Sequence, residues 1–303
     1  MSEQFIPHWE QVKGNTWCIC TDHARIPVYF LDEYRVILLD SGLPGNKNAV
    51  LSLLEQKHAQ VVAILTSHTH PDHIGNHNAI REKYGAKIYM TPFAAATCMD
   101  PLTMYATLGG RAGFRPIRDR MGMTVPADVM IPWGDGQITV EGATFQVVTS
   151  EGHCAEHVSF ITPDNVAYLG DALQTVDYMQ HLRLIYSTGL EAELNAKRKL
   201  AQLHCDKYII AHNGVVEDIA ETARIAIEEI EKRLDIFVQL ADTPATVDEL
   251  VRRFLVHSGA DLSNWRTVHG VHYNAYAFLS YLTDTKRLDI IVEDGCMKYV
   301  RPQ

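Results

Sequence analysis

TSHTHPDHIG, residues 66–75, is the stretch on which the interpretation of the whole chain depends. It follows the apolar run VVAILT (61–66) and holds four potential ligands within six positions: His68, His70, Asp72 and His73. A buried strand that ends here would deliver these side chains to one loop, and Pro71 stiffens that loop because proline fixes its own φ. Imidazole and carboxylate groups bind zinc, iron or manganese at about 2.0–2.2 Å. The spacing therefore predicts a metal site, with a merely histidine-rich polar loop as the alternative.

Three further candidate ligands follow apolar runs elsewhere in the chain. His153 comes shortly after FQVVTS (145–150), Asp171 after NVAY (165–168), and His212 after KYII (207–210). Neighbouring glycines would let the backbone approach such a site closely. Taken singly, each residue could be a helix cap or a hydrogen-bonded core residue. Together with the first group they complete a ligand set at the ends of strands.

The periodicity of the remaining sequence favours an α/β fold. Short apolar runs predict strands at NTWCICT (15–21), PVYFLD (27–32), RVILLDSG (35–42) and AKIYMT (86–91). Amphipathic stretches predict helices at NAVLSLLEQKH (48–58), NHNAIREKYG (76–85), which Gly85 ends, and residues 216–240. Strands and helices thus alternate along the first 240 residues.

Five segments in this order resemble the motifs of the metallo-β-lactamase superfamily: LLDSG, SHTHPDHIGN, SEGHCAEHVSF, YLGDAL and IIAHNG, over about residues 15–215. The resemblance implies an αββα sandwich with a two-metal site at one edge of its sheets. It implies that the first metal is held by His68, His70 and His153, and the second by Asp72, His73 and His212. Asp171 would bridge both metals. Asp40 would orient a ligating histidine, since such rings need their second nitrogen fixed.

This arrangement implies hydrolysis. Two metals about 3.5–4 Å apart can share a water and lower its pKa toward neutrality, so a bridging hydroxide would attack without a side-chain nucleophile. Asp72 is the predicted catalytic proton handler. We expect two divalent ions, zinc first, with iron or manganese as alternatives. His70 stands where flavin-linked di-iron members of the superfamily carry Glu, which disfavours redox chemistry.

The carboxyl-terminal residues predict a second, smaller domain, 241–303, after a catalytic domain of residues 1–240. Thr246 precedes Glu249 by three positions, which predicts a capping box. A helix is expected over 274–288, and a hairpin over 288–301 that turns at Asp294 and Gly295. Helix, helix, hairpin resembles the winged-helix module appended to some lactamase-like hydrolases. With seven Lys and Arg against eight Asp and Glu, a packing or dimerisation role is the plainer interpretation.

Two groups of residues are predicted to contact the substrate. The stretch 94–126 is rich in arginine and methionine, and we expect it to form a lid in which Arg111 and Arg115 bind an anionic end of an otherwise apolar substrate. A solvated helix is the alternative. His269, His272 and Tyr273 are expected to reach the substrate from the carboxyl-terminal module, with ordinary packing as the alternative.

Composition narrows the functions that remain. The chain has 303 residues and a formal net charge of −10, which argues against a nucleic-acid partner because such binding normally rests on excess Lys and Arg. The leading hypothesis is hydrolysis of a small thioester or ester, broadly similar to glyoxalase II. A phosphodiesterase or ribonuclease is the second, and a noncatalytic metal-binding regulatory protein the third.

Location and assembly are expected from the same inspection. No stretch approaches the roughly 20 apolar residues of a membrane span, and the amino end has no basic flank followed by an apolar run. We therefore expect a cytoplasmic protein without a membrane partner. Assembly into a homo-oligomer is left open.

Overall fold

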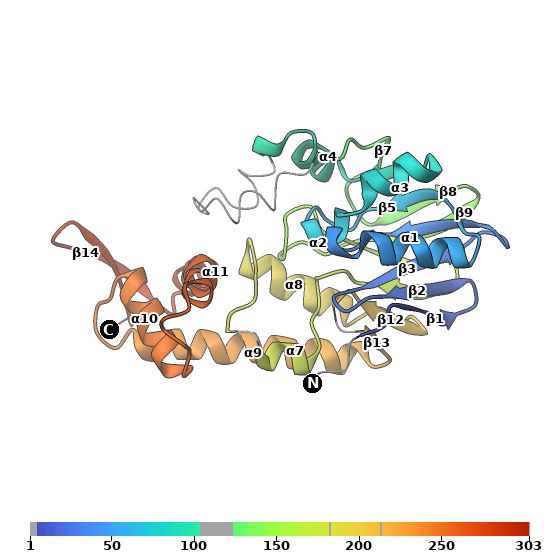
Figure 1. Ribbon diagram of the computed structural model, residues 1–303. Coiled ribbons are helices and arrows are strands. Elements are labelled where there is room, and N and C mark those ends of the chain that lie inside the picture. The colour runs from blue at the N-terminus through green and yellow to red at the C-terminus, as the bar shows by residue number, and fades with distance from the viewer. Residues whose placement is uncertain (1–4, 104–123, 182, 213, 303) are drawn as a thin grey trace.

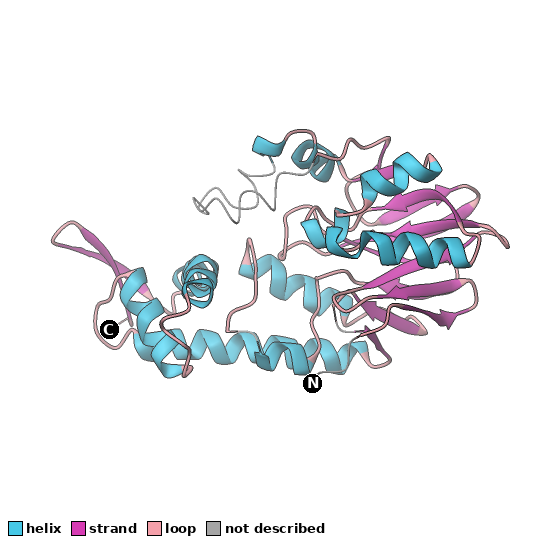
Figure 2. Ribbon diagram, in the orientation of Figure 1, coloured by secondary structure: helices cyan, strands magenta, loops and turns pink. Residues whose placement is uncertain are grey.

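The computed structural model describes residues 5–103, 124–181, 183–212 and 214–302 (Figure 1). Two β-sheets stack face to face in its larger part, and helices lie on both outer faces (Figure 2). Arg111 and Arg115, the arginines of the predicted lid, lie outside the described residues.

The first sheet takes its strands in chain order. They are β1 (His8–Lys13), β2 (Thr16–Cys20), β3 (Arg25–Phe30), β4 (Arg35–Leu39), β5 (Gln60–Leu65), β6 (Lys87–Met90) and β7 (Val129–Met130). Pairing is antiparallel from β1 to β4 and parallel from β4 to β7. The parallel half brings the carboxyl ends of β4 and β5, and so the residues that follow them, to one edge.

The second sheet runs in the order β13 (Gly214–Val216), β12 (Lys207–Ile210), β11 (Val166–Tyr168), β10 (Val158–Ile161), β9 (Ala143–Thr149) and β8 (Gly136–Val140). β11 and β12 are parallel neighbours, whereas the other pairs are antiparallel. The parallel pair carries the residues after both strands, including Asp171 and His212, to the same edge as those of the first sheet.

Along a central strand, buried side chains alternate between the two faces, as a sandwich covered by helices requires. In β4, Ile37 and Leu39 join the core between the sheets, whereas Val36 and Leu38 face the helices outside. On that side lie α1 (Lys47–Gln56), α3 (His77–Tyr84) and α4 (Pro92–Cys98). The second sheet is covered by the end of α8 (Leu190–Leu200) and the first half of α9 (Ile219–Leu240). The predicted αββα sandwich is therefore confirmed.

The carboxyl-terminal elements follow the predicted order of two helices and a hairpin. They are α10 (Val247–His257), α11 (Trp265–Asp284), β14 (Asp289–Glu293) and β15 (Cys296–Val300). The capping box of Thr246 and Glu249 is confirmed, as is the turn between β14 and β15. α11 begins ahead of its predicted start because the Asn264 side chain accepts from two backbone amides and caps it. The winged-helix identity of this module stays a prediction.

α9 connects the two parts of the molecule. Its 22 residues run from the second sheet, where Ala223 and Ala226 are buried, to the carboxyl-terminal core, where Ile230, Leu234 and Phe237 pack against α10 and α11. α9 is amphipathic, with charged residues on its other face. Within the described part of the chain, no helix is both long and apolar enough to cross a membrane.

Candidate metal centre

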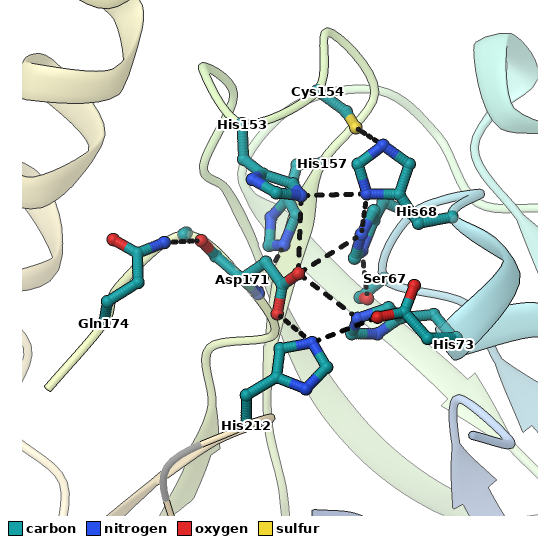
Figure 3. A network of polar contacts seen from close by, with 12 residues as sticks. Ser67, His68, His73, His153, Cys154, His157, Asp171, Gln174 and His212 are labelled. Carbon is teal, nitrogen blue, oxygen red and sulfur yellow. Dashed lines mark hydrogen bonds and ion pairs between the residues drawn. The ribbon is translucent and has the colours of Figure 1, made fainter. Parts of the chain in front are cut away.

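The seven predicted ligands lie together at one edge of the sandwich, where four loops meet. Figure 3 labels five of them: His68, His73, His153, Asp171 and His212. His68 follows β5, and His70 precedes the short helix α2 (Pro71–Ile74), which carries Asp72 and His73. The other three follow strands of the second sheet. These polar residues lie close together because each follows a buried strand, and the strands end at the same edge of the sandwich.

The Asp171 carboxylate lies in the middle of this group (Figure 3). Its Oδ2 is 3.4 Å from both His73 Nε2 and His153 Nε2, and 3.9 Å from His68 Nε2. Its other oxygen, Oδ1, is 3.2 Å from His212 Nε2. One carboxylate therefore faces ligand atoms of both predicted metal positions.

Three imidazoles form the first group. His70 Nδ1 lies 3.1 Å from His68 Nε2 and 2.9 Å from His153 Nε2. Nitrogens bound to one tetrahedral zinc at about 2.0–2.1 Å would lie about 3.3–3.4 Å apart, so this spacing is close to that of three ligands on one ion. His68 and His153 are buried and His70 is half-buried, and desolvation lowers the pKa of His70 to about 4, which keeps one of its nitrogens available as a ligand. The residues fit a divalent cation.

The second group combines Asp72, His73 and His212. His212 donates from Nδ1 to the carbonyl of His23 at 2.7 Å, so its Nε2 lone pair faces Asp72 Oδ2 at 3.3 Å as well as Asp171. A lone pair aimed at two carboxylates needs a proton or a cation between them. Burial lowers the pKa of His212, but the two carboxylates raise it to about 12. Positive charge is therefore stabilised among these three side chains, and a divalent ion would supply it.

Asp40 contacts the second group from behind. It lies directly after β4, and its Oδ2 accepts hydrogen bonds from His73 Nδ1 at 2.8 Å and from Tyr168 Oη at 2.7 Å. Its Oδ1 accepts from the backbone amide of Ser67 at 2.7 Å. The bond holds a proton on Nδ1, so Nε2, which faces Asp171, is the nitrogen that would bind a cation. This is the contact that an orienting role for Asp40 requires.

Asp40→Asn is expected to weaken divalent-metal binding about 10- to 100-fold, because the amide removes the charge that His73 Nδ1–H faces. Metal titration against a chromogenic chelator would measure it. Asp32→Asn, which changes an exposed carboxylate in the turn after β3, is the matched control and should bind metal as the parent does. An unchanged metal affinity in Asp40→Asn would contradict an orienting role for Asp40.

Two residues that sequence reasoning did not single out also touch the site. His157 Nε2 accepts from the backbone amide of Asp171 at 3.1 Å, while its Nδ1 contacts Ser150 Oγ at 2.8 Å. Gly170 makes room for this contact, since a Cβ there would lie 2.6 Å from His157 Nε2. Cys154 Sγ lies 3.4 Å from His70 Nε2. Both belong to the segment EGHCAEH, whose density of polar residues was the available signal.

A buried ion pair lies behind the Asp171 loop. Lys197 Nζ donates to Glu193 Oε1 at 2.6 Å, to the Ala172 carbonyl at 2.9 Å and to Gln174 Oε1 at 3.1 Å. Gln174 Nε2 in turn donates to the Asp171 carbonyl at 2.6 Å (Figure 3). Hydrogen bonds thus connect α8 to the loop that carries the central carboxylate. The sequence signal was weak: two charged residues share the apolar face of α8 with Leu190 and Leu194.

The predicted substrate residues of the carboxyl-terminal module are placed differently from one another. The Tyr273 ring stacks on Tyr186 with centroids 5.6 Å apart, and Tyr186 lies 4.9 Å from the His70 ring and 5.0 Å from the His153 ring. His269 is 6.5 Å from the Tyr273 ring. His272 Nε2 lies 2.7 Å from Asp248 Oδ1 of α10. Tyr273 therefore contacts the ligand histidines only indirectly, through the ring of Tyr186. His272 instead contacts Asp248 of its own module.

The sequence is similar to those of known hydrolases, and the fold is similar to that of a solved structure. A hydroxyacylglutathione hydrolase of Albidiferax ferrireducens is 29% identical over 146 residues, which are 47% of this chain and 45% of that protein. One of Pelagibacter ubique is 22% identical over 251 residues, which are 76% of this chain and 90% of that protein. The solved structure of a beta-lactamase domain protein from Burkholderia ambifaria has a TM-score of 0.72 at 17% identity and covers 99% of this chain and 97% of its own.

The first of these relatives is thus matched over less than half its length, and the solved structure shows likeness of fold alone. The family profile of the metallo-beta-lactamase superfamily matches residues 25–212, which is more than half of the chain. That region spans β3 to the end of β12 and contains all seven predicted ligands. The chain belongs to the metallo-β-lactamase superfamily.

Proposed function

We propose that the protein is a dinuclear-metal hydrolase of a small thioester or ester. The observation that carries this proposal is the Asp171 carboxylate, which faces His153 of the first ligand group and both His73 and His212 of the second. His68, His70 and His153 would hold one ion, and Asp72, His73 and His212 the other. Zinc is the first candidate, with iron or manganese as alternatives. Bound there, two ions would supply a water of lowered pKa and polarise the substrate carbonyl.

Asp72 is the carboxylate best placed to move a proton. Its side chain is 35% exposed, whereas those of Asp171 and Asp40 are 11% and 2% exposed. Asp72 is therefore the most accessible of the three to a substrate entering from solvent. Burial raises the pKa of Asp72, but the hydrogen bond to His212 and the charge of His73 lower it by more, so the carboxyl group is ionised. We assign it the acceptance of the proton that the attacking water loses.

The leaving group favours thioesters. A thiol of pKa about 8.5 departs as a thiolate more easily than an alcohol departs as an alkoxide, so little protonation is needed. The two curated relatives described above are named for hydrolysis of hydroxyacylglutathione. We propose a small-molecule substrate, residues 1–240 as the catalytic domain and 241–303 as an accessory domain beside the site.

Purified protein should hydrolyse an acyl thioester, and a chelator should abolish that turnover because it removes the ions that the ligand set holds. The test is the initial rate on a panel of an acyl thioester, a lactone, a chromogenic phosphodiester and a short single-stranded RNA. Each substrate is run with chelator, without it, and with zinc restored.

Chelator-sensitive cleavage of RNA or phosphodiester alone would contradict the thioester proposal. It would favour the alternative of a nuclease guided by the carboxyl-terminal module. Where zinc does not restore turnover, manganese and iron are added in its place. Loss that none of the three metals restores would have a damaged fold as its cause, which circular dichroism of the chelated protein would reveal.

A further inference from the structure

A pocket opens onto one side of the candidate metal centre, and it has about 420 Å³ of empty space when the open solvent at its mouth is included. Asp171, His153 and His212 form the side shared with the centre. The opposite wall comes from the segment around Ile185 and from α7 (Val176–His181). A substrate whose reacting carbonyl lies beside Asp171 would therefore have part of its body in this pocket.

The deep walls of the pocket are apolar. Leu173, Ile185 and Ile210 line it, and each is at most 1% exposed. Tyr178, which is 38% exposed, lies at the mouth. Gln174 also lines it, but its amide nitrogen donates to the Asp171 carbonyl and its amide oxygen accepts from Lys197. Its polar groups are thus already used.

The charged residues around the pocket also favour an uncharged occupant. Among the described residues that line the pocket, none is Lys or Arg, and the one carboxylate is Asp171 of the centre itself. An anionic group placed deep in the pocket would meet no Lys or Arg, because the positive charge beside the pocket is confined to the end formed by His212 and the metal centre. The pocket therefore suits an uncharged part of the substrate, and any anionic end would have to lie elsewhere.

Packing on two sides holds this shape. Leu173 and Ile210 belong to the core outside the second sheet, whereas Ile185 belongs to the carboxyl-terminal core. Tyr186 at the same wall stacks on Tyr273 of α11. The pocket thus lies where the two cores meet and is formed before a substrate arrives, as is usual for small-molecule sites.

We propose that this pocket binds the acyl chain of the substrate, and that the chain is an uncharged aliphatic group of about four to eight carbons. The proposal rests on the proposed thioester or ester hydrolysis and names its substrate class. The acyl chain lies against Leu173, Ile185 and Ile210, the carbonyl lies beside Asp171, and the leaving group points out past the mouth. Each methylene removed from water then contributes to binding.

The test uses the zinc-loaded protein and S-acyl-N-acetylcysteamine thioesters with acetyl, butyryl, hexanoyl and octanoyl chains. kcat/KM is expected to rise about fourfold per methylene until the pocket is full. Calorimetry with ketone analogues, in which a methylene replaces the thioester sulfur, measures binding without turnover and should show the same increments. Equal binding and equal kcat/KM across the series would overturn the proposal.

The two readouts separate this proposal from the proposed function. Thioesters that are cleaved at one rate whatever their chain length would refute the acyl pocket and leave the hydrolase standing. Ketones that bind more tightly with length, without turnover of any thioester, would refute thioester hydrolysis and support the pocket.

Variants at two neighbouring positions, 184 and 185, test whether the acyl chain lies against this wall of the pocket. Ile185→Phe should fill the pocket and lower the octanoyl-to-acetyl ratio of kcat/KM by about tenfold or more, whereas Ile185→Ala should move the plateau to longer chains. Leu184→Phe and Leu184→Ala are the matched controls, because Leu184 is 5% exposed in the same core and does not line the pocket. A ratio is independent of the fraction of folded protein. Equal shifts at both positions would contradict a role for this wall.

Discussion

Replacing Asp171 with asparagine is expected to lower kcat/KM about a thousandfold or more on any substrate that the protein hydrolyses. The amide keeps the shape of the side chain but removes the charge that faces His73 and His153 on one oxygen and His212 on the other. Loss of a bound ion removes several kcal/mol of transition-state stabilisation, and each 1.36 kcal/mol is worth about tenfold in rate. His68→Ala should have a comparable effect, since it removes a ligand atom of the first group.

Metal content distinguishes this explanation from unfolding. Asp171→Asn should retain its circular dichroism spectrum while binding fewer than two ions per chain by elemental analysis. Asp135→Asn, which alters a carboxylate that pairs with Lys199 away from the centre, is the control and should keep both its ions and its activity. Full activity in Asp171→Asn or in His68→Ala would refute the proposed ligand set.

The ligands that could be predicted share a local signature. Four of the ligands lie within six consecutive positions, so the sequence itself brings them together: His68, His70, Asp72 and His73. His153, Asp171 and His212 are distant in sequence, but each follows a strand that the apolar pattern predicts, and parallel neighbours end at the same edge. The αββα architecture followed from family resemblance, because periodicity alone does not specify which strands become neighbours.

Residues that act through tertiary contacts could not be predicted in this way. Tyr186 reaches the rings of His70 and His153 from a loop with no regular pattern. His157 could equally have been a ligand, and only its contacts with Ser150 and Asp171 place it behind the centre. α8 is the clearest example of a contact that could not be predicted. Its end is rich in lysine, which suggests a solvated surface, yet Lys197 is buried.

Lys197→Met is expected to lower the free energy of unfolding by about 3–5 kcal/mol, because it leaves a buried carboxylate without its cation. Both partners are at most 1% exposed, and burial raises the pKa of Glu193. The substitution also removes the donor to Gln174 and to the Ala172 carbonyl, so the Asp171 loop loses its support from α8. Chemical denaturation, followed by circular dichroism, measures the change.

Two further variants decide whether burial of the charge is the cause. Lys199→Met lies two positions along the same helix, where the lysine is 37% exposed and pairs with Asp135, and should cost less than about 1 kcal/mol. The double variant Glu193→Leu with Lys197→Met removes both charges and should recover most of the lost stability, since a buried pair can be replaced by apolar residues at little cost. Equal losses in Lys197→Met and Lys199→Met, or no recovery in the double variant, would mean that the pair is not what stabilises this region. Recovery of stability together with normal metal content would show that Gln174 holds the Asp171 loop without the lysine.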